Sequence, residues 1–221
     1  MIALNNLYNI NAKLARHNTT LLVVSKNQSI EKIIKVYQAG QRLFAENRVQ
    51  DLLSKKELLP DDISWHMIGT LQRNKVKYIA PFIAMIHSID NMGLAKEVNK
   101  QAQKHNRIIN CLLQIYISKD DTKFGFDIKE VLNDEFLIQI NELKHIRICG
   151  LMGMATLTDN EKIVRQEFKK LKILFDKLKP LFTSEFKHLS MGMSGDYHIA
   201  LEEGSTLVRI GSAVFDFISY K

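Results

Sequence analysis

Eight short apolar segments recur along the chain, and longer stretches separate them. The segments are rich in Val, Ile, Leu, Phe and Met, and their length and composition are typical of buried β-strands. They span residues 21–24, 42–45, 63–68, 83–89, 108–117, 145–152, 185–191 and 206–210. The pattern therefore predicts eight strands.

The stretches between these segments carry apolar residues three and four positions apart, which is the spacing of one face of an α-helix. Leu94, Val98 and Ala102 form one such group, and residues 4–17 add a helical segment ahead of the first strand. Eight strands that alternate with helices predict the α/β class and a single (β/α)8 TIM barrel with an extra N-terminal helix. An open doubly wound sheet is the alternative, because a sequence defines the number of strands only to within one or two.

The composition is that of one globular domain covering residues 1–221. Hydrophobic residues make up 46% of the chain and charged residues 25%, and only 3 prolines and 10 glycines interrupt it. Cys111 and Cys149 lie in apolar segments, with neither the spacing of a zinc site nor enough partners for a disulfide scaffold. These features favour a location in the reducing cytoplasm.

The hydropathy and charge patterns argue against a membrane or a nucleic acid as partner. No run of about 18 apolar residues is present, and the first residues lack the basic and apolar regions of an export signal. The 31 Lys and Arg residues exceed the 24 Asp and Glu residues, which gives a net charge of +7. The lysines are scattered along helical segments, however, and form no basic arm.

In a barrel of this type, functional residues collect in the loops after the C-terminal ends of the strands. Lys26 directly follows the first strand, where its amine can form an imine with an aldehyde. Segments 190–194 and 204–211 bring glycines and hydroxyl groups to the last two strands, where barrels commonly bind phosphate. A barrel that binds pyridoxal phosphate (PLP) needs both features. The alternatives are a lysine that extends into water and ordinary Gly/Ser turns.

Eight stretches in the same order make the chain similar to the pyridoxal phosphate homeostasis proteins. They are residues 23–26, 44–47, 65–69, 87–90, 123–126, 150–152, 189–194 and 204–211. The resemblance extends over residues 21–215. Ala45 departs from the family pattern because it replaces the usual glycine, and its methyl group is expected to narrow the cofactor pocket. Arg48 stands where an aromatic residue is common.

This resemblance implies a barrel similar to the N-terminal domain of alanine racemase, with PLP as a covalently bound cofactor. Lys26 would form the Schiff base, Asn47 would lie close to the cofactor, and Arg209 would face the pyridine nitrogen. The phosphate-binding loops of the family correspond to Ser190, Ser194, Thr206 and Gly211. Lys123 corresponds to a second lysine, which is associated with handling the cofactor.

The expected function is that of a PLP carrier or reservoir in intracellular PLP homeostasis. Enzymes that use PLP to labilise bonds often pair the pyridine nitrogen with a carboxylate. An arginine can only donate, so Arg209 favours a neutral pyridine and weak stabilisation of a carbanion. Racemisation also needs a second acid or base, which alanine racemase takes from a domain that this chain is expected to lack. We therefore expect no catalytic residue and an indirect effect on amino-acid and keto-acid balance. The alternative is a PLP-dependent amino-acid racemase.

A metal centre is the third class of site to consider. The candidate ligands are His66, His87 and His188, with Glu46, Asp90 and Asp196 near them in sequence. No pair has a recognisable ligand spacing, so we expect histidines of the barrel interior and no metal. The expected partners are PLP and the enzymes that require it, and the expected state is a monomer.

Overall fold

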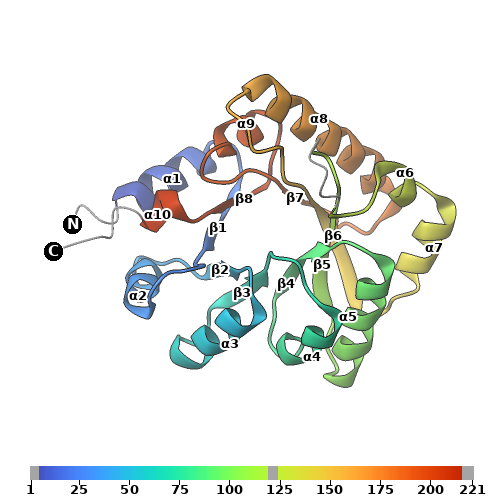
Figure 1. Ribbon diagram of the computed structural model, residues 1–221, viewed down its shortest axis with the longest axis horizontal. Helices are drawn as coiled ribbons and strands as arrows, with labels where there is room; N and C mark the ends of the chain where they lie inside the picture. The colour runs from blue at the N-terminus through green and yellow to red at the C-terminus, as the bar shows by residue number, and fades with distance from the viewer. Residues whose placement is uncertain (1–4, 119–123, 216–221) are drawn as a thin grey trace.

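Eight parallel strands close into a barrel in the order of the chain (Figure 1). The structure is a computed structural model that describes residues 5–118 and 124–215. Its strands are β1 (Thr20–Val24), β2 (Leu43–Glu46), β3 (Ser64–Met67), β4 (Met85–Ile89), β5 (Ile109–Gln114), β6 (Ile146–Met152), β7 (His188–Ser190) and β8 (Leu207–Ile210). Each of them overlaps one predicted apolar segment. Because β8 pairs with β1, with Leu22 opposite Arg209, the sheet is closed and the prediction of a TIM barrel is confirmed.

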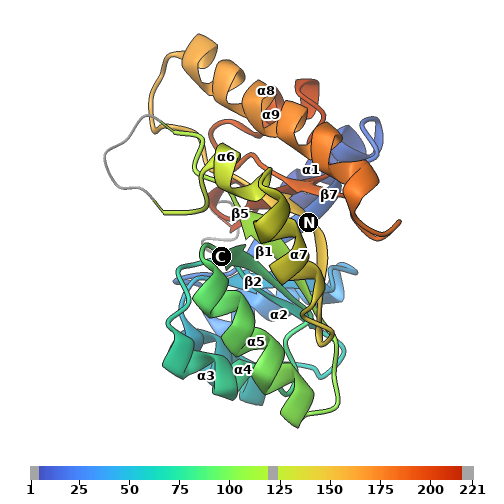
Figure 2. The same ribbon diagram turned by 90° about the vertical axis from the view of Figure 1, so that its right-hand side faces the viewer.

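Helices surround the barrel on the outside, and in both views α8 lies on the opposite side from α3 and α4 (Figure 2). The α-helices are α1 (Asn5–Ala15), α2 (Ile30–Gln38), α3 (Val49–Leu58), α4 (Val76–Ile79), α5 (Met92–Lys104), α6 (Ile128–Val131), α7 (Asp134–Asn141), α8 (Glu161–Leu178), α9 (Tyr197–Glu202) and α10 (Ser212–Phe215). Two short 3₁₀ helices are η2 (Arg73–Lys75) and η3 (Lys179–Leu181). The predicted N-terminal helix is α1, where the Asn6 side chain donates to the carbonyl of Ala213 (3.3 Å).

Side-chain caps define where several helices begin. The Ser29 hydroxyl accepts from the backbone N–H of Lys32 at the start of α2, and the Asn91 side chain accepts from that of Leu94 at the start of α5 (2.8 Å). Such caps satisfy N–H groups that have no partner within the helix and typically contribute about 1 kcal/mol each. They fix where the loops that follow β1 and β4 end and the helices α2 and α5 begin.

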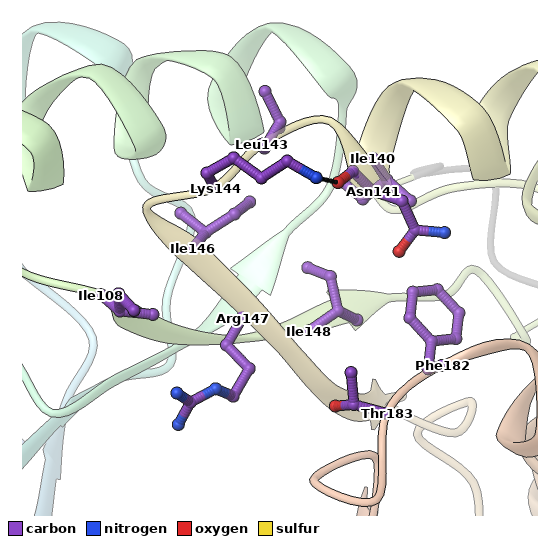
Figure 3. A pocket seen from close by; sticks show the side chains of 10 residues that line it. All are labelled: Ile108, Ile140, Asn141, Leu143, Lys144, Ile146, Arg147, Ile148, Phe182 and Thr183. Atoms are coloured by element: carbon purple, nitrogen blue, oxygen red, sulfur yellow. Dashed lines mark hydrogen bonds between the residues drawn. The ribbon is translucent and has the colours of Figure 1, made fainter.

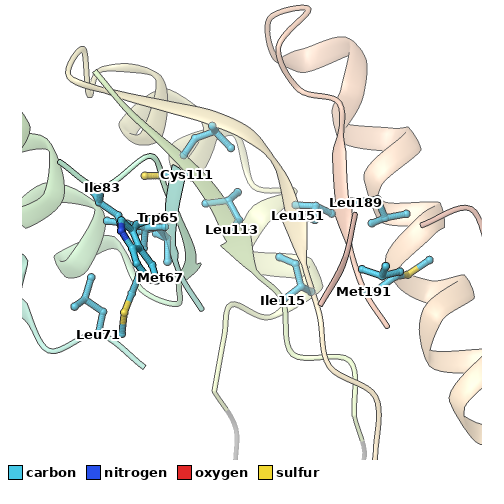
Figure 4. Packing of buried hydrophobic residues seen from close by; sticks show 14 of the residues in the cluster. Trp65, Met67, Leu71, Ile83, Cys111, Leu113, Ile115, Leu151, Leu189 and Met191 are labelled. Carbon is cyan, nitrogen blue, oxygen red and sulfur yellow. The ribbon is translucent and has the colours of Figure 1, made fainter. Parts of the chain in front are cut away.

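Alternation along the strands divides the core into two layers. Trp65, Met67 and Leu113 belong to the main cluster between the barrel and the helices (Figure 4). The barrel interior holds a cluster of Leu22, Ala45 and Leu207 and another of Met85, Leu112, Cys149 and Met152. The interior also contains buried polar side chains from β3, β4, β7 and β8, which lie beneath the site described below.

Gly150 lets β6 and β7 approach each other. Its φ angle is +148°, and a Cβ at this position would lie 1.8 Å from the carbonyl oxygen of His188. A side chain there is incompatible with the pairing that continues the barrel from β6 to β7. In the described parts of the chain, none of the helices has the length and apolar character needed to cross a membrane.

Candidate functional site

A cavity of about 630 Å³ opens at the C-terminal ends of the strands. The loops after β1, β2, β3, β5, β6, β7 and β8 contribute its walls. Five of the residues predicted from the sequence line it, namely Lys26, Asn47, Ser194, Arg209 and Gly211. Lys26 and Gly211, which are about 185 positions apart in the chain, thus line one cavity at the C-terminal end of the barrel, where functional residues were expected.

Lys26 is held at the cavity by a buried ion pair beneath it. The preceding residue, Ser25, is fully buried, and its hydroxyl donates to Glu46 Oε1 (2.7 Å). The Lys55 ammonium donates both to the same Glu46 oxygen (2.6 Å) and to the carbonyl of Ser25 (2.7 Å). We call Ser25, Glu46 and Lys55 the strand clamp, because it ties the end of β1 to β2 and α3. The side chain of Lys26 itself remains exposed and lines the cavity.

The loop after β3 packs directly against the backbone of Asn47, which follows β2. A Cβ at Gly69 would lie 2.2 Å from the carbonyl oxygen of Asn47. Only a glycine lets the loop after β3 pass this close to the backbone that carries the Asn47 amide into the cavity.

Arg209 forms the buried wall of the cavity. One of its terminal nitrogens, Nη1, donates to the carbonyl (2.8 Å) and to the hydroxyl (2.7 Å) of Ser190, and Nη2 donates to the carbonyl of Gly153 (3.1 Å). Burial lowers the pKa of Arg209 to about 10, so the guanidinium is still charged near neutral pH. Three of the five N–H bonds of an arginine are accounted for by these contacts, which leaves donors for a ligand in the cavity.

Ser194, Gly195, Gly211 and Ser212 form a polar corner where the loops after β7 and β8 meet. The backbone N–H of Gly211 donates to the hydroxyl of Ser194 (3.4 Å). A Cβ at Gly211 would lie 3.0 Å from the carbonyl oxygen of Val24, and one at Gly195 would meet no atom within 4 Å. Small side chains thus keep the backbone accessible, as a site for an anion requires.

Ser190 and Thr206, both predicted in phosphate-binding loops, do not line this cavity. Ser190 points into the barrel, where its hydroxyl contacts Arg209 and His87. Thr206 precedes β8, so it lies at the N-terminal end of the barrel, where its hydroxyl accepts from the backbone N–H of Leu189 (2.7 Å). We therefore leave both residues out of the polar corner.

The structure adds residues to the cavity that sequence analysis did not identify. Gly195 and Ser212 directly follow predicted site residues, and their adjacency was the available signal. Phe124, Met154 and Met193 form an apolar rim, with exposed fractions of 53%, 42% and 37%. Phe124 and Met193 lie in stretches that carry the family resemblance, which was the available signal, whereas Met154 lies outside those stretches.

The positions of Ala45 and Arg48 answer two further expectations, and a third falls on a residue that the structure does not describe. Ala45 packs with Leu22 and Leu207 inside the barrel, so its methyl group does not narrow the cavity, contrary to expectation. Arg48 lines the cavity mouth. Lys123 lies outside the described residues.

His66 and His87 contact each other instead of converging on a common point with carboxylates. Nδ1 of His66 lies 2.9 Å from Nε2 of His87. Burial lowers the pKa of His66 to about 3, and it lowers the pKa of His87 well below its ordinary value. Within residues 5–118 and 124–215, no three side chains of His, Cys, Asp or Glu are grouped as metal ligands.

A smaller cavity of about 220 Å³ lies at the opposite end of the barrel (Figure 3). Ile108, Ile146 and Ile148 form much of its lining, between α7 and the chain around Phe182. Its polar lining residues are Asn141, Lys144, Arg147 and Thr183, and the Lys144 ammonium donates to the carbonyl of Asn141 (2.9 Å). None of the site residues predicted from the sequence lines this cavity, so the larger cavity is the candidate site.

Comparison with known proteins shows the family to which the chain belongs. The family model described as the N-terminal domain of alanine racemase matches residues 3–217. The pyridoxal phosphate homeostasis protein of Aquifex aeolicus is 41% identical over 196 residues, which cover 88% of this chain and 85% of the relative.

Solved structures show the same relationship. PipY of Synechococcus elongatus, solved without PLP, has a TM-score of 0.89 and 33% identity, and the match covers 97% of this chain and 100% of PipY. The PLP-bound structure of PipY has a TM-score of 0.86 and 32% identity with the same coverage. Alanine racemase of Clostridium difficile has a TM-score of 0.73 at 16% identity, and the match covers 96% of this chain but 55% of the racemase. This last similarity shows a shared fold alone.

Proposed function

The chain belongs to the family of the alanine racemase N-terminal domain, and within it to the pyridoxal phosphate homeostasis proteins; on this basis we propose that it binds PLP and acts as a PLP carrier or reservoir. The observation that carries the proposal is the convergence of Lys26, Arg209 and the polar corner on one cavity. Its setting is the cytoplasm, where enzymes that require PLP would receive the cofactor.

The residues of the cavity fit PLP. The cofactor presents an aldehyde, a pyridine nitrogen and a phosphate, and the cavity offers an amine, a guanidinium and an anion site in the corresponding roles. Gly211 lets the loop after β8 lie close to the end of β1 at the cavity, since a Cβ there would lie 3.0 Å from the carbonyl oxygen of Val24. No carboxylate from the described residues lines the cavity, so none of these residues would repel a phosphate.

Each group has a distinct task. The amine of Lys26 would bind the aldehyde carbon covalently, with loss of water. Arg209 would donate an N–H to the pyridine nitrogen and so keep that nitrogen unprotonated. The hydroxyl groups of Ser194 and Ser212 and the backbone N–H of Gly195 would hold the phosphate, and the Gly211 N–H would orient the Ser194 hydroxyl.

When bound, PLP supplies an electron-poor ring that can stabilise negative charge on an attached amine. Arg209 weakens that ability because it cannot accept a proton from the ring nitrogen. Storage of a reactive aldehyde needs only reversible attachment at Lys26, which these residues provide. An amino-acid racemase is the alternative, and only the distant likeness of fold to alanine racemase favours it.

The first experiment tests the anchor. Purified protein incubated with PLP should develop the absorbance of an imine, and reduction with borohydride should place the adduct on Lys26 in a peptide map. Lys26→Ala should remove this absorbance and leave the circular dichroism spectrum unchanged, because the side chain is exposed and packs against little. Lys35→Ala, which removes an exposed lysine of α2, is the matched control. An adduct on another lysine, or no absorbance at all, would contradict the proposed site.

A second experiment separates carrier from racemase. The loaded protein, as a monomer, should restore activity to an apoenzyme that requires PLP, even when a phosphatase removes free PLP. Its rate of alanine racemisation should equal that of free PLP. A faster rate that Lys26→Ala abolishes would establish the racemase instead.

A further inference from the structure

Polar side chains continue from Arg209 into the barrel and end at β3. Nη1 of Arg209 donates to the hydroxyl of Ser190, whose oxygen lies 3.2 Å from Nδ1 of His87. The other ring nitrogen of His87 lies 2.9 Å from Nδ1 of His66. We call these four residues the Arg209 network. Ser190 and His87 have no exposed surface, and Arg209 and His66 are 4% and 5% exposed.

The hydrogen bonds of this network have one direction. A guanidinium has no acceptor, so Arg209 must donate to the Ser190 oxygen. The buried hydroxyl of Ser190 then needs an acceptor, and Nδ1 of His87 is the acceptor within reach. His87 must therefore carry its proton on Nε2, and it donates to Nδ1 of His66. The same reasoning places the proton of His66 on its own Nε2.

Burial, with a smaller contribution from neighbouring charges, favours the neutral form of both rings. Burial is the main reason that the pKa of His87 is depressed, and His66, Arg209 and His188 add to it. For His66 the reasons are burial and His188. A neutral imidazole is what the Ser190 hydroxyl requires, because a protonated ring has no lone pair to accept with.

A core that served stability alone would not use these residues. Burial of imidazole, hydroxyl and guanidinium groups costs free energy that hydrogen bonds only offset. Elsewhere in the same barrel interior the equivalent space is filled by apolar clusters such as Leu22, Ala45 and Leu207. The polar residues occur on the side that leads to Arg209, which is the wall of the cavity.

From this geometry we infer that Ser190, His87 and His66 are positioning residues, which hold the Arg209 guanidinium in the orientation that presents its remaining N–H groups to the cofactor ring. The inference rests on the proposed function, because it assigns Arg209 to the PLP ring. Ser190 fixes Nη1, and the neutral histidines fix the Ser190 hydroxyl. A change at His87, which does not line the cavity, is thereby transmitted to Arg209 through two hydrogen bonds, and from Arg209 to the ligand.

The network itself is tested without PLP. Long-range ¹H–¹⁵N NMR of the histidine rings should show His66 and His87 as neutral rings protonated on Nε2. Ser190→Ala should change the ring-nitrogen shifts of His87, and Ser190→Thr, which keeps the hydroxyl, should preserve them. Protonation of His87 on Nδ1 in the parent protein would overturn the inference, whether or not the protein binds PLP.

The positioning role is tested with PLP bound. His87→Leu removes the acceptor, and it should raise the Kd for PLP about tenfold and shift the absorption maximum of the bound cofactor. His87→Gln offers an amide oxygen to Ser190 and an amide N–H to His66, so it should restore most of the affinity and the absorption maximum. If His87→Leu does not fold, Ser190→Ala against Ser190→Thr makes the same comparison. Equal affinity and spectrum in the variant and the parent would refute the positioning role, whereas no PLP binding by the parent would refute the proposed function.

Discussion

The buried histidine pair predicts a specific loss of stability in acid. His66 and His87 are neutral in the barrel, where burial lowers the pKa of His66 to about 3 and that of His87 well below its ordinary value. In the unfolded chain each ring has a pKa of about 6.5. Below that value the unfolded state binds a proton that the folded state does not, so the free energy of unfolding falls as the pH falls. The loss begins near the unfolded pKa and ends only below the folded one.

The magnitude follows from proton linkage. Between about pH 6 and about pH 5, a histidine whose pKa falls from about 6.5 in the unfolded chain to about 3 in the folded one, as for His66, lowers the free energy of unfolding by about 1.2 kcal/mol, and His87 adds to the loss. His66→Gln should therefore show a decline that is smaller than that of the parent by about 1.2 kcal/mol over this range. Carboxylates that titrate in the same range contribute equally to both proteins and cancel in the comparison.

Urea unfolding at a series of pH values provides the assay, with the fluorescence of the single tryptophan, Trp65, as the signal. Trp65 is 1% exposed, so unfolding transfers it from the core to water. His17→Gln is the control, because His17 is exposed in the folded chain as well. An identical decline in His66→Gln and the parent would refute the reasoning, since it would mean that His66 takes up its proton without unfolding.

Two further predictions concern residues that determine the barrel geometry. Lys55→Met should lower the free energy of unfolding by about 3–5 kcal/mol in chemical denaturation, because it leaves the buried Glu46 without a cation, and adding Glu46→Leu should recover much of the loss. Little effect of Lys55→Met alone would show that the ion pair is dispensable. Gly150→Ala should prevent folding, as judged by circular dichroism, since the new Cβ would lie 1.8 Å from a backbone oxygen of β7, whereas Gly195→Ala should fold normally because the space around it is open. A native spectrum for Gly150→Ala would contradict the close approach of β6 and β7.

Most of the barrel was predictable, because its strands are nearly uninterrupted apolar segments and each contributes a local signal. Lys26 and Ser194 were predictable for a related reason, since each follows a strand and thus reaches the functional end of the barrel. Thr206 shows the limit of this rule, as it precedes β8 and therefore lies at the opposite end. A residue that follows a strand lies at the functional end of the barrel, and one that precedes a strand lies at the other end. The exact bounds of each strand therefore decide where a flanking residue such as Thr206 lies.

The Arg209 network could not be predicted in the same way. Ser190 and His87 belong to strands that are far apart in the sequence, and their contact depends on which residues of each strand face inward. A shift of one residue in the register would turn both side chains toward the helices. The apolar pattern does not define that register at short strands such as β7, where polar and apolar residues are both buried.

The strand clamp has a consequence for chemical selectivity. Two lysine amines lie near the end of β1: that of Lys26 lines the cavity, and that of Lys55 is buried against the carbonyl of Ser25. The Lys55 ammonium is committed to Glu46 and to the carbonyl of Ser25, so it offers no free electron pair to an electrophile. Lys26 makes no such commitment in the structure and is open to reaction. The ion pair that stabilises the end of β1 thus also keeps the Lys55 amine unreactive. Of the two lysines, Lys26 is left to react with an aldehyde.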